Sequence, residues 1–116
     1  MTLKVLIIGG VAAGPKTAAR LRRLDSDAEI TVIERQDLLS YAGCGLPYYI
    51  EDIIKDWYQL LGGDNIRDAE FFKKQKGFTV LDQTEAKKIN REKKTVTIED
   101  LRTGEKRDLP YDKLVI

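Results

Sequence analysis

The hydrophobic pattern of this chain changes from alternating strands and helices in its first part to short strands in its second. A continuous β-branched and leucine run at residues 3–8 predicts a strand buried on both faces, as in a parallel sheet. Apolar residues at helical spacing, among them Ala18 and Leu21, predict a helix over residues 13–24. Apolar and polar residues then alternate over residues 29–34, which predicts a second strand.

Shorter elements are predicted for the rest of the chain, from residue 36 onward. The predicted elements are a polar loop at 36–45, a short helix starting near Pro47, a flexible break at 62–65, an amphipathic helix at 67–76 closed by Gly77, and strands at 78–81, 86–90, 95–101 and 111–116, with a turn at Thr103-Gly104. Strand, helix, strand, helix, strand and a small β-meander predict an α/β fold: an open parallel sheet with an antiparallel excursion.

The composition of the chain indicates which binding partners and which cellular compartment to expect. A length of 116 residues is that of one domain. Twenty basic and nineteen acidic residues nearly cancel, which disfavours nucleic acid or an anionic membrane as a partner. The longest apolar run, Val5–Ile8, is too short to span a bilayer. One cysteine fits a reducing cytoplasm, and the lack of histidine excludes imidazole metal sites and Cys-His dyads within the chain. We therefore expect a cytoplasmic location and no metal site.

The segment Gly9-Gly10-Val11-Ala12-Ala13-Gly14 follows a predicted strand and opens a predicted helix. The N–H groups at a helix N-terminus suit a pyrophosphate, and Gly14 permits close helix–strand packing. Glu34 ends the second strand, where a carboxylate accepts hydrogen bonds from ribose hydroxyls, so we expect FAD or NAD rather than NADP. Val11 replaces the middle glycine of the usual fingerprint. The alternative to dinucleotide binding is that residues 9–14 form a strand-to-helix turn with a purely structural role.

The single cysteine, Cys44, lies ten residues past Glu34. It precedes a predicted helix N-terminus, whose dipole favours the nucleophilic thiolate. Gly43 and Gly45 flank it and leave the sulfur accessible. A buried, inert thiol is the alternative, and the polar, glycine-rich setting argues against it.

Basic side chains share one face of the first predicted helix. Lys16, Arg20 and Arg23 are spaced i, i+4, i+7, and Arg22 lies on the flank. Guanidinium groups bind phosphates well, so this face could hold a phosphorylated ligand. A solvated helix face is the alternative.

Together, the glycine turn at 9–14 and the motif Ser40-x-x-x-Cys44-Gly45-Leu46-Pro47-Tyr48-Tyr49-Ile50 resemble the single-cysteine pyridine nucleotide–disulfide oxidoreductases, closest to the coenzyme A-disulfide reductase branch. Val11 is usual in that branch, and the resemblance covers the whole chain. It implies the N-terminal part of a Rossmann-like FAD-binding domain, with the NAD(P)H-binding and dimerisation domains absent and a homodimer as the full-length protein. We also expect a fragment because residues 111–116 predict a strand that enters a core just as the chain stops.

The resemblance also implies roles for individual residues. NAD(P)H would reduce FAD, FAD would reduce a mixed disulfide between Cys44 and coenzyme A, and Cys44 would be the catalytic residue. The expected FAD contacts are Gly9, Gly10, Val11, Ala12, Ala13, Gly14, Glu34, Arg35 and Ala86. The expected substrate contacts are Arg20, Arg22, Arg23, Ser40 and Gly43.

Three interpretations of the activity remain open at this point. The first is a reductase that acts on coenzyme A disulfide or a related persulfide. Both substrates stay open because a persulfide-reducing branch of the family has a nearly identical motif, and because Gly43 stands where coenzyme A-disulfide reductases often have asparagine. NADH oxidases and peroxidases cycle the same cysteine through sulfenic acid, although their motif typically continues Cys-Gly-Met. The third interpretation is a nucleotide-binding redox module without turnover. We expect the 116 residues alone to be inactive and to lack part of the FAD contacts.

Overall fold

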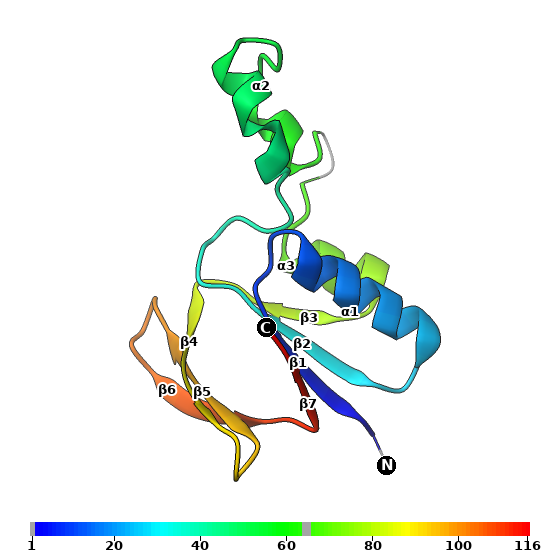
Figure 1. The fold of residues 1–116 in the computed structure, drawn as a ribbon, viewed down its shortest axis with the longest axis vertical. Coiled ribbons are helices and arrows are strands. Elements are labelled where there is room, and N and C mark those ends of the chain that lie inside the picture. Colours follow the sequence, from blue (N-terminus) through cyan, green and yellow to red (C-terminus); the bar gives the residue numbers. More distant parts are fainter. Residues whose placement is uncertain (1, 64–65) are drawn as a thin grey trace.

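The computed structural model describes residues 2–63 and 66–116, and the predicted break at 62–65 thus lies partly outside the described residues. The described chain forms three layers: helices, a four-stranded parallel sheet, and a three-stranded antiparallel sheet (Figure 1). The strands are β1 (Lys4–Ile8), β2 (Glu29–Ile33), β3 (Thr79–Leu81), β4 (Thr84–Asn90), β5 (Thr95–Asp100), β6 (Lys106–Pro110) and β7 (Lys113–Val115). The predicted α/β fold class is confirmed.

The parallel sheet has the strand order β3-β2-β1-β7. β1 is central and pairs in parallel with both β2 and β7. Its side chains point alternately to the two faces, and Val5, Leu6 and Ile7 are all buried. The continuous apolar run therefore predicted the doubly covered strand correctly.

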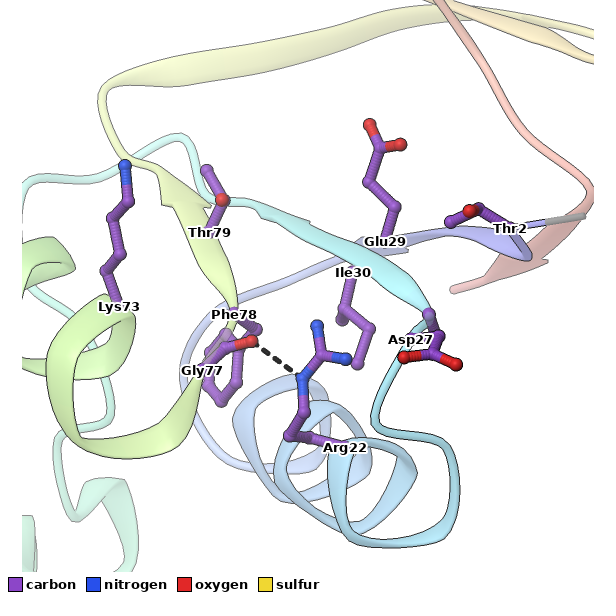
Figure 2. A pocket seen from close by; sticks show the side chains of 10 residues that line it. Thr2, Arg22, Asp27, Glu29, Ile30, Lys73, Gly77, Phe78 and Thr79 are labelled. Carbon is purple, nitrogen blue, oxygen red and sulfur yellow. Dashed lines mark hydrogen bonds between the residues drawn. The ribbon is translucent and has the colours of Figure 1, made fainter.

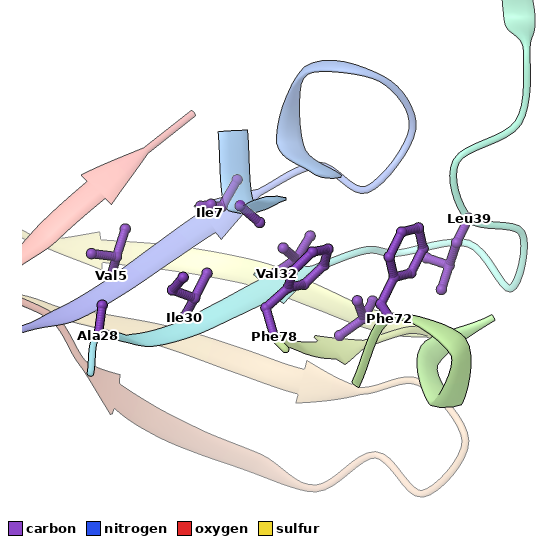
Figure 3. Packing of buried hydrophobic residues seen from close by; sticks show 10 residues of the cluster. Val5, Ile7, Ala28, Ile30, Val32, Leu39, Phe72 and Phe78 are labelled. Atoms are coloured by element: carbon purple, nitrogen blue, oxygen red, sulfur yellow. The ribbon is translucent and has the colours of Figure 1, made fainter. Parts of the chain in front are cut away.

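One core lies between the parallel sheet and the helix layer (Figure 3). The helix layer consists of α1 (Ala13–Leu24), the short α3 (Ala69–Phe71) and the π-helical turn η3 (Phe72–Lys76). Val5 and Ile7 of β1 pack here with Ala18 of α1 and with Phe72 and Phe78, whose rings stack at a centroid distance of 5.0 Å.

The second core lies on the opposite face of the parallel sheet, beneath the antiparallel sheet. Leu6 and Ile33 pack there against Val96 and Ile98 of β5. The antiparallel sheet has the order β4-β5-β6, and its β4–β5 register shifts between Ala86 and Lys88, which is a β-bulge.

Several predicted boundaries differ from the structure by one to two residues: β3 begins at Thr79, β4 at Thr84 and β7 at Lys113, and β5 ends at Asp100. One further boundary and one missed strand have an identifiable cause. The helix predicted from Arg67 begins at Ala69, because the Asp68 side chain caps it: Oδ1 accepts the N–H of Phe71 at 2.8 Å. Its end at Gly77 is confirmed, with φ of +73°. The strand β6 was not predicted separately. It is charged, and its Pro110 suits an edge position.

Residues 41–63 form an arm that projects from the sheets and helices (Figure 1). The arm contains the 3-10 turn η1 (Gly43–Gly45), α2 (Leu46–Ile50) and the 3-10 helix η2 (Trp57–Leu61). Leu60 and Leu61 are buried in it, whereas Tyr48, Ile50 and Trp57 are more than half exposed. The predicted short helix near Pro47 is confirmed.

Within residues 2–63 and 66–116, no helix is both long and apolar enough to cross a bilayer. The same residues hold no cluster of three or more histidine, cysteine or carboxylate side chains placed to bind a metal ion.

Candidate functional site

The turn between β1 and α1 requires glycine at its first and last positions, Gly9 and Gly14. Gly9 has φ of +112°, a region that other residues rarely adopt. A Cβ on Gly14 would lie 1.7 Å from the carbonyl oxygen of Gly9, so only glycine allows α1 to start this close to β1. Among the described residues no side chain caps the N-terminus of α1, and its first turn carries no acidic residue. The N–H groups at this end are thus available to an anion.

Gly10 and Glu34 form the second part of the turn. Glu34 is 7% exposed, and its carboxylate accepts the N–H of Gly10 through Oε1 at 2.9 Å and the N–H of Gln36 through Oε2 at 2.7 Å. A Cβ on Gly10 would lie 2.9 Å from Cβ of Glu34. Glycine is therefore needed at position 10 because Glu34 packs directly against it.

These residues fit the adenosine and pyrophosphate of a dinucleotide. Each Glu34 oxygen accepts one hydrogen bond and keeps a second lone pair, which can accept a ribose hydroxyl. Val11 and Ala12 lie at the free N-terminus of α1, and Arg35 follows Glu34 with an exposed side chain. Ala86 borders the β-bulge, where an interrupted ladder leaves backbone free to contact a ligand.

A pocket of about 630 Å³ opens beside this turn. Its walls come from the start of α1, the 40–42 loop, the arm and the α3–η3 segment. Four cationic side chains line it, and none of the described residues that line it is acidic. The lining residues are Val11, Ala12, Pro15, Lys16, Ala19, Arg23, Ser40, Tyr41, Ala42, Gln59, Leu60, Gly62, Arg67, Phe71, Phe72 and Lys76. Such a pocket, here called the basic pocket, favours a ligand with several negative charges.

The structure brings together part of the predicted substrate set. Arg23 and Ser40 line the basic pocket, as Lys16 does, whereas Arg20 and Gly43 lie outside its lining. Ser40 is held in a left-handed conformation, φ +50°, with its N–H donated to the carbonyl of Gly10 at 2.8 Å. The glycine turn at 9–14 thus holds the start of the segment that leads to Cys44.

Arg22 lines a second pocket, drawn in Figure 2, whereas Arg23 lines the basic pocket. The Nε of Arg22 donates to the carbonyl of Gly77 at 2.8 Å, and Nη1 donates to the carbonyls of Ser26 and Asp25. Arg22 thus closes the C-terminus of α1 and ties it to the end of η3. The sequence grouped Arg22 with a ligand-binding face, but its Nε and Nη1 groups donate to backbone carbonyls instead.

Cys44 is exposed and occupies the middle of η1, two residues after Ala42 of the pocket wall. The N–H of Gly45 donates to the carbonyl of Ala42 at 2.9 Å, which closes the turn around the sulfur. The alternative of a buried thiol is therefore wrong for the described chain, and a reagent can reach the sulfur.

Comparison with known proteins identifies the family. A model of the pyridine nucleotide-disulphide oxidoreductase family matches residues 3–116. The chain belongs to this family. The family is one of flavin-dependent enzymes that use NAD(P)H.

Three members of the oxidoreductase family are similar over nearly all of the chain. A coenzyme A disulfide reductase of Staphylococcus haemolyticus is 38% identical over 97% of the chain and 25% of its own length. The structure of reduced CoADR-RHD from Bacillus anthracis is 39% identical, with a TM-score of 0.89 over 98% of the chain and 20% of that protein. An NAD-dependent persulfide reductase from A. fulgidus is 44% identical, with a TM-score of 0.87 over 97% and 20%. The chain thus spans about a quarter or less of these relatives.

Sequence reasoning missed half of the cations that line the basic pocket. Arg67 and Lys76 lie more than 40 residues after Arg23. Arg67 precedes α3 by two residues, and Lys76 ends η3. Only the tertiary packing of α3 and η3 beside α1 brings them close. A partial signal was present, since Arg67 and Lys76 are the first and last residues of a predicted amphipathic helix, whose apolar face had to pack on the sheet.

Proposed function

We propose that this chain is the N-terminal part of the FAD-binding domain of a longer NAD(P)H:disulfide oxidoreductase that reduces coenzyme A disulfide or a related persulfide through Cys44. The relatives named as coenzyme A disulfide reductase and persulfide reductase support this choice. The share of those relatives that the chain spans supports its assignment to one part of a larger protein.

The basic pocket is the observation that carries the proposal. Its four cations would bind the phosphates of coenzyme A, and Ala42 at its wall is two residues from the exposed sulfur of Cys44. A phosphorylated disulfide held by these cations would bring its sulfur atoms toward the thiol. A disulfide without phosphates would make no comparable ionic contacts with the pocket.

In the proposed reaction, the Cys44 thiolate attacks one sulfur of coenzyme A disulfide. The S–S bond breaks, one coenzyme A leaves as thiolate and takes up a proton, and a mixed disulfide joins Cys44 to the other coenzyme A. Gly9, Gly10, Gly14 and Glu34 would hold FAD, which would supply the electron pair from NAD(P)H. That pair breaks the S–S bond of the mixed disulfide, which restores the Cys44 thiolate and releases the second coenzyme A as a thiolate that takes up a proton. The remaining proposed contacts of the cofactor are Val11, Ala12, Ala13, Arg35 and Ala86.

We extend the proposal to the complete protein as a homodimer in the cytoplasm. The single cysteine, which fits a reducing compartment, supports the location, and the motif around Cys44 supports the assembly through its family resemblance.

The first test is the intact mass of the complete protein after reaction with coenzyme A disulfide, measured without reductant. We expect an adduct with the mass of one coenzyme A that disappears on reduction. The Cys44→Ser variant should form no adduct and lose at least about a thousandfold in turnover while keeping its FAD, because the sulfur alone makes the covalent bond.

Other masses would redirect or reject the assignment. An adduct of one or two sulfur atoms at Cys44 favours the persulfide as substrate, and an adduct of one oxygen favours the sulfenic acid chemistry of oxidases and peroxidases. Disulfide turnover that survives Cys44→Ser would contradict the proposed mechanism.

A second prediction concerns the charges of the basic pocket. Arg23→Gln and Lys76→Gln should each raise KM for coenzyme A disulfide about fivefold to tenfold, since each removes one charge–phosphate contact. KM for hydroxyethyl disulfide, which is uncharged, should not change. Steady-state kinetics at low and high salt would check this, because salt screening should shrink the difference.

Lys74→Gln is the matched control for Lys76→Gln. Lys74 lies in the same η3 segment but is exposed and paired with Glu70 at 2.7 Å, outside the pocket lining. Equal effects of Lys74→Gln and Lys76→Gln on KM would show that general charge, rather than the pocket, attracts the substrate.

A further inference from the structure

Gly45, directly after Cys44, is not required by its backbone conformation. Its φ of −87° and ψ of −8° are open to any residue. A Cβ at this position would, however, lie 2.7 Å from Cδ2 of Leu60, well inside the ~3.5–4.0 Å at which carbon atoms make contact. The next neighbours, Ile54 and Ala42, would be at ordinary distances of 3.6 and 3.9 Å. A methyl group at position 45 would therefore displace the end of the Leu60 side chain.

Leu60 is also bound to the cysteine turn through its backbone. Its carbonyl accepts the N–H of Ala42 at 2.7 Å, and the carbonyl of Ala42 accepts the N–H of Gly45 at 2.9 Å. Leu60 is 7% exposed and lines the basic pocket. One side chain thus contacts the pocket, and the same residue holds both ends of the turn that carries Cys44.

We propose that Leu60 is a positioning residue for Cys44: through its contact with Gly45 and its hydrogen bond from Ala42, it aligns the thiolate with a disulfide bound in the basic pocket. This inference rests on the proposed function and adds a residue to it. Leu60 itself contributes no polar group to the reaction, so its effect must pass through the geometry of the turn.

The test is a double-mutant cycle of Leu60→Ala and Gly45→Ala in the complete protein with its flavin. Two second-order rates of Cys44 are measured: one with coenzyme A disulfide and one with iodoacetamide, a small reagent that needs no alignment. Each single variant loosens or displaces the turn. We expect each to slow the coenzyme A disulfide reaction about tenfold and to speed alkylation about twofold to fivefold.

The double variant distinguishes a specific fit between residues 45 and 60 from a general loss of structure around the turn. The methyl group added by Gly45→Ala would occupy space that Leu60→Ala vacates, so both rates should return to within about threefold of the unmodified protein. Leu61→Ala is the matched control: Leu61 is 4% exposed, adjacent, and outside the pocket lining. It should lower the temperature of flavin release as much as Leu60→Ala does, yet leave the coenzyme A disulfide rate within about twofold.

The outcomes separate this inference from the proposed function. If the unmodified protein is alkylated but forms no adduct with coenzyme A disulfide, the proposed function is wrong, and the alkylation rates alone decide on Leu60. Single-variant defects that simply add in the double variant would overturn the positioning role. Equal loss of the coenzyme A disulfide rate in Leu60→Ala and Leu61→Ala would overturn it as well.

Discussion

Gly14→Ala should yield a complete protein without FAD and with the first βα unit destabilised by about 3 kcal/mol or more. The added Cβ would lie 1.7 Å from the carbonyl oxygen of Gly9 and 3.4 Å from a methyl carbon of Ile7. The oxygen belongs to the backbone and cannot rotate away, so α1 must move off β1. That movement breaks the turn whose N–H groups would hold the pyrophosphate.

The flavin-to-protein absorbance ratio and the temperature of flavin release would measure this effect. Gly43→Ala is the matched control for stability, because a Cβ there would meet only the ring of Tyr41, at 3.6 Å, among the described residues. We expect Gly43→Ala to change the release temperature by no more than a few degrees. A Gly14→Ala protein that retains stoichiometric FAD would contradict the assignment of this turn.

The parts of the fold that could be predicted are those set by local periodicity. The apolar run of β1 predicted a strand covered on both faces, and Val5, Leu6 and Ile7 bear this out. The position of Glu34 at the end of β2 predicted its place beside the glycine turn, because parallel neighbours end at the same edge of a sheet. The charged sequence of β6 gave no such signal, since only pairing with β5 makes it a strand.

The parts of the site that could not be predicted depend on contacts between distant segments. Arg22 and Arg23 are neighbours in sequence with the same charge, yet Arg22 bonds to the carbonyl of Gly77 while Arg23 lines the basic pocket. Arg67 and Lys76 join that pocket only because α3 and η3 pack beside α1. The contact between Leu60 and Gly45 likewise requires the arm to fold back on itself.

Glu34 should tolerate replacement by glutamine poorly, although the two side chains have nearly the same shape. Both carboxylate oxygens accept backbone N–H groups, from Gly10 at 2.9 Å and from Gln36 at 2.7 Å. A glutamine amide offers one oxygen, so one of these donors would face an NH₂ group and lose its partner. An unpaired buried donor costs about 1–3 kcal/mol.

Hydrogen–deuterium exchange of the complete protein would locate that cost. In Glu34→Gln we expect the amides of Gly10 or Gln36 to exchange about tenfold to a hundredfold faster, which corresponds to the loss of one buried hydrogen bond, and FAD to be released at a lower temperature. Glu29→Gln is the matched control, because Glu29 begins the same strand β2 but is exposed. Because the carbonyl of Gly10 also accepts the N–H of Ser40, the faster exchange should extend to Ser40. Unchanged exchange at all three amides would mean that the carboxylate does not hold the turn.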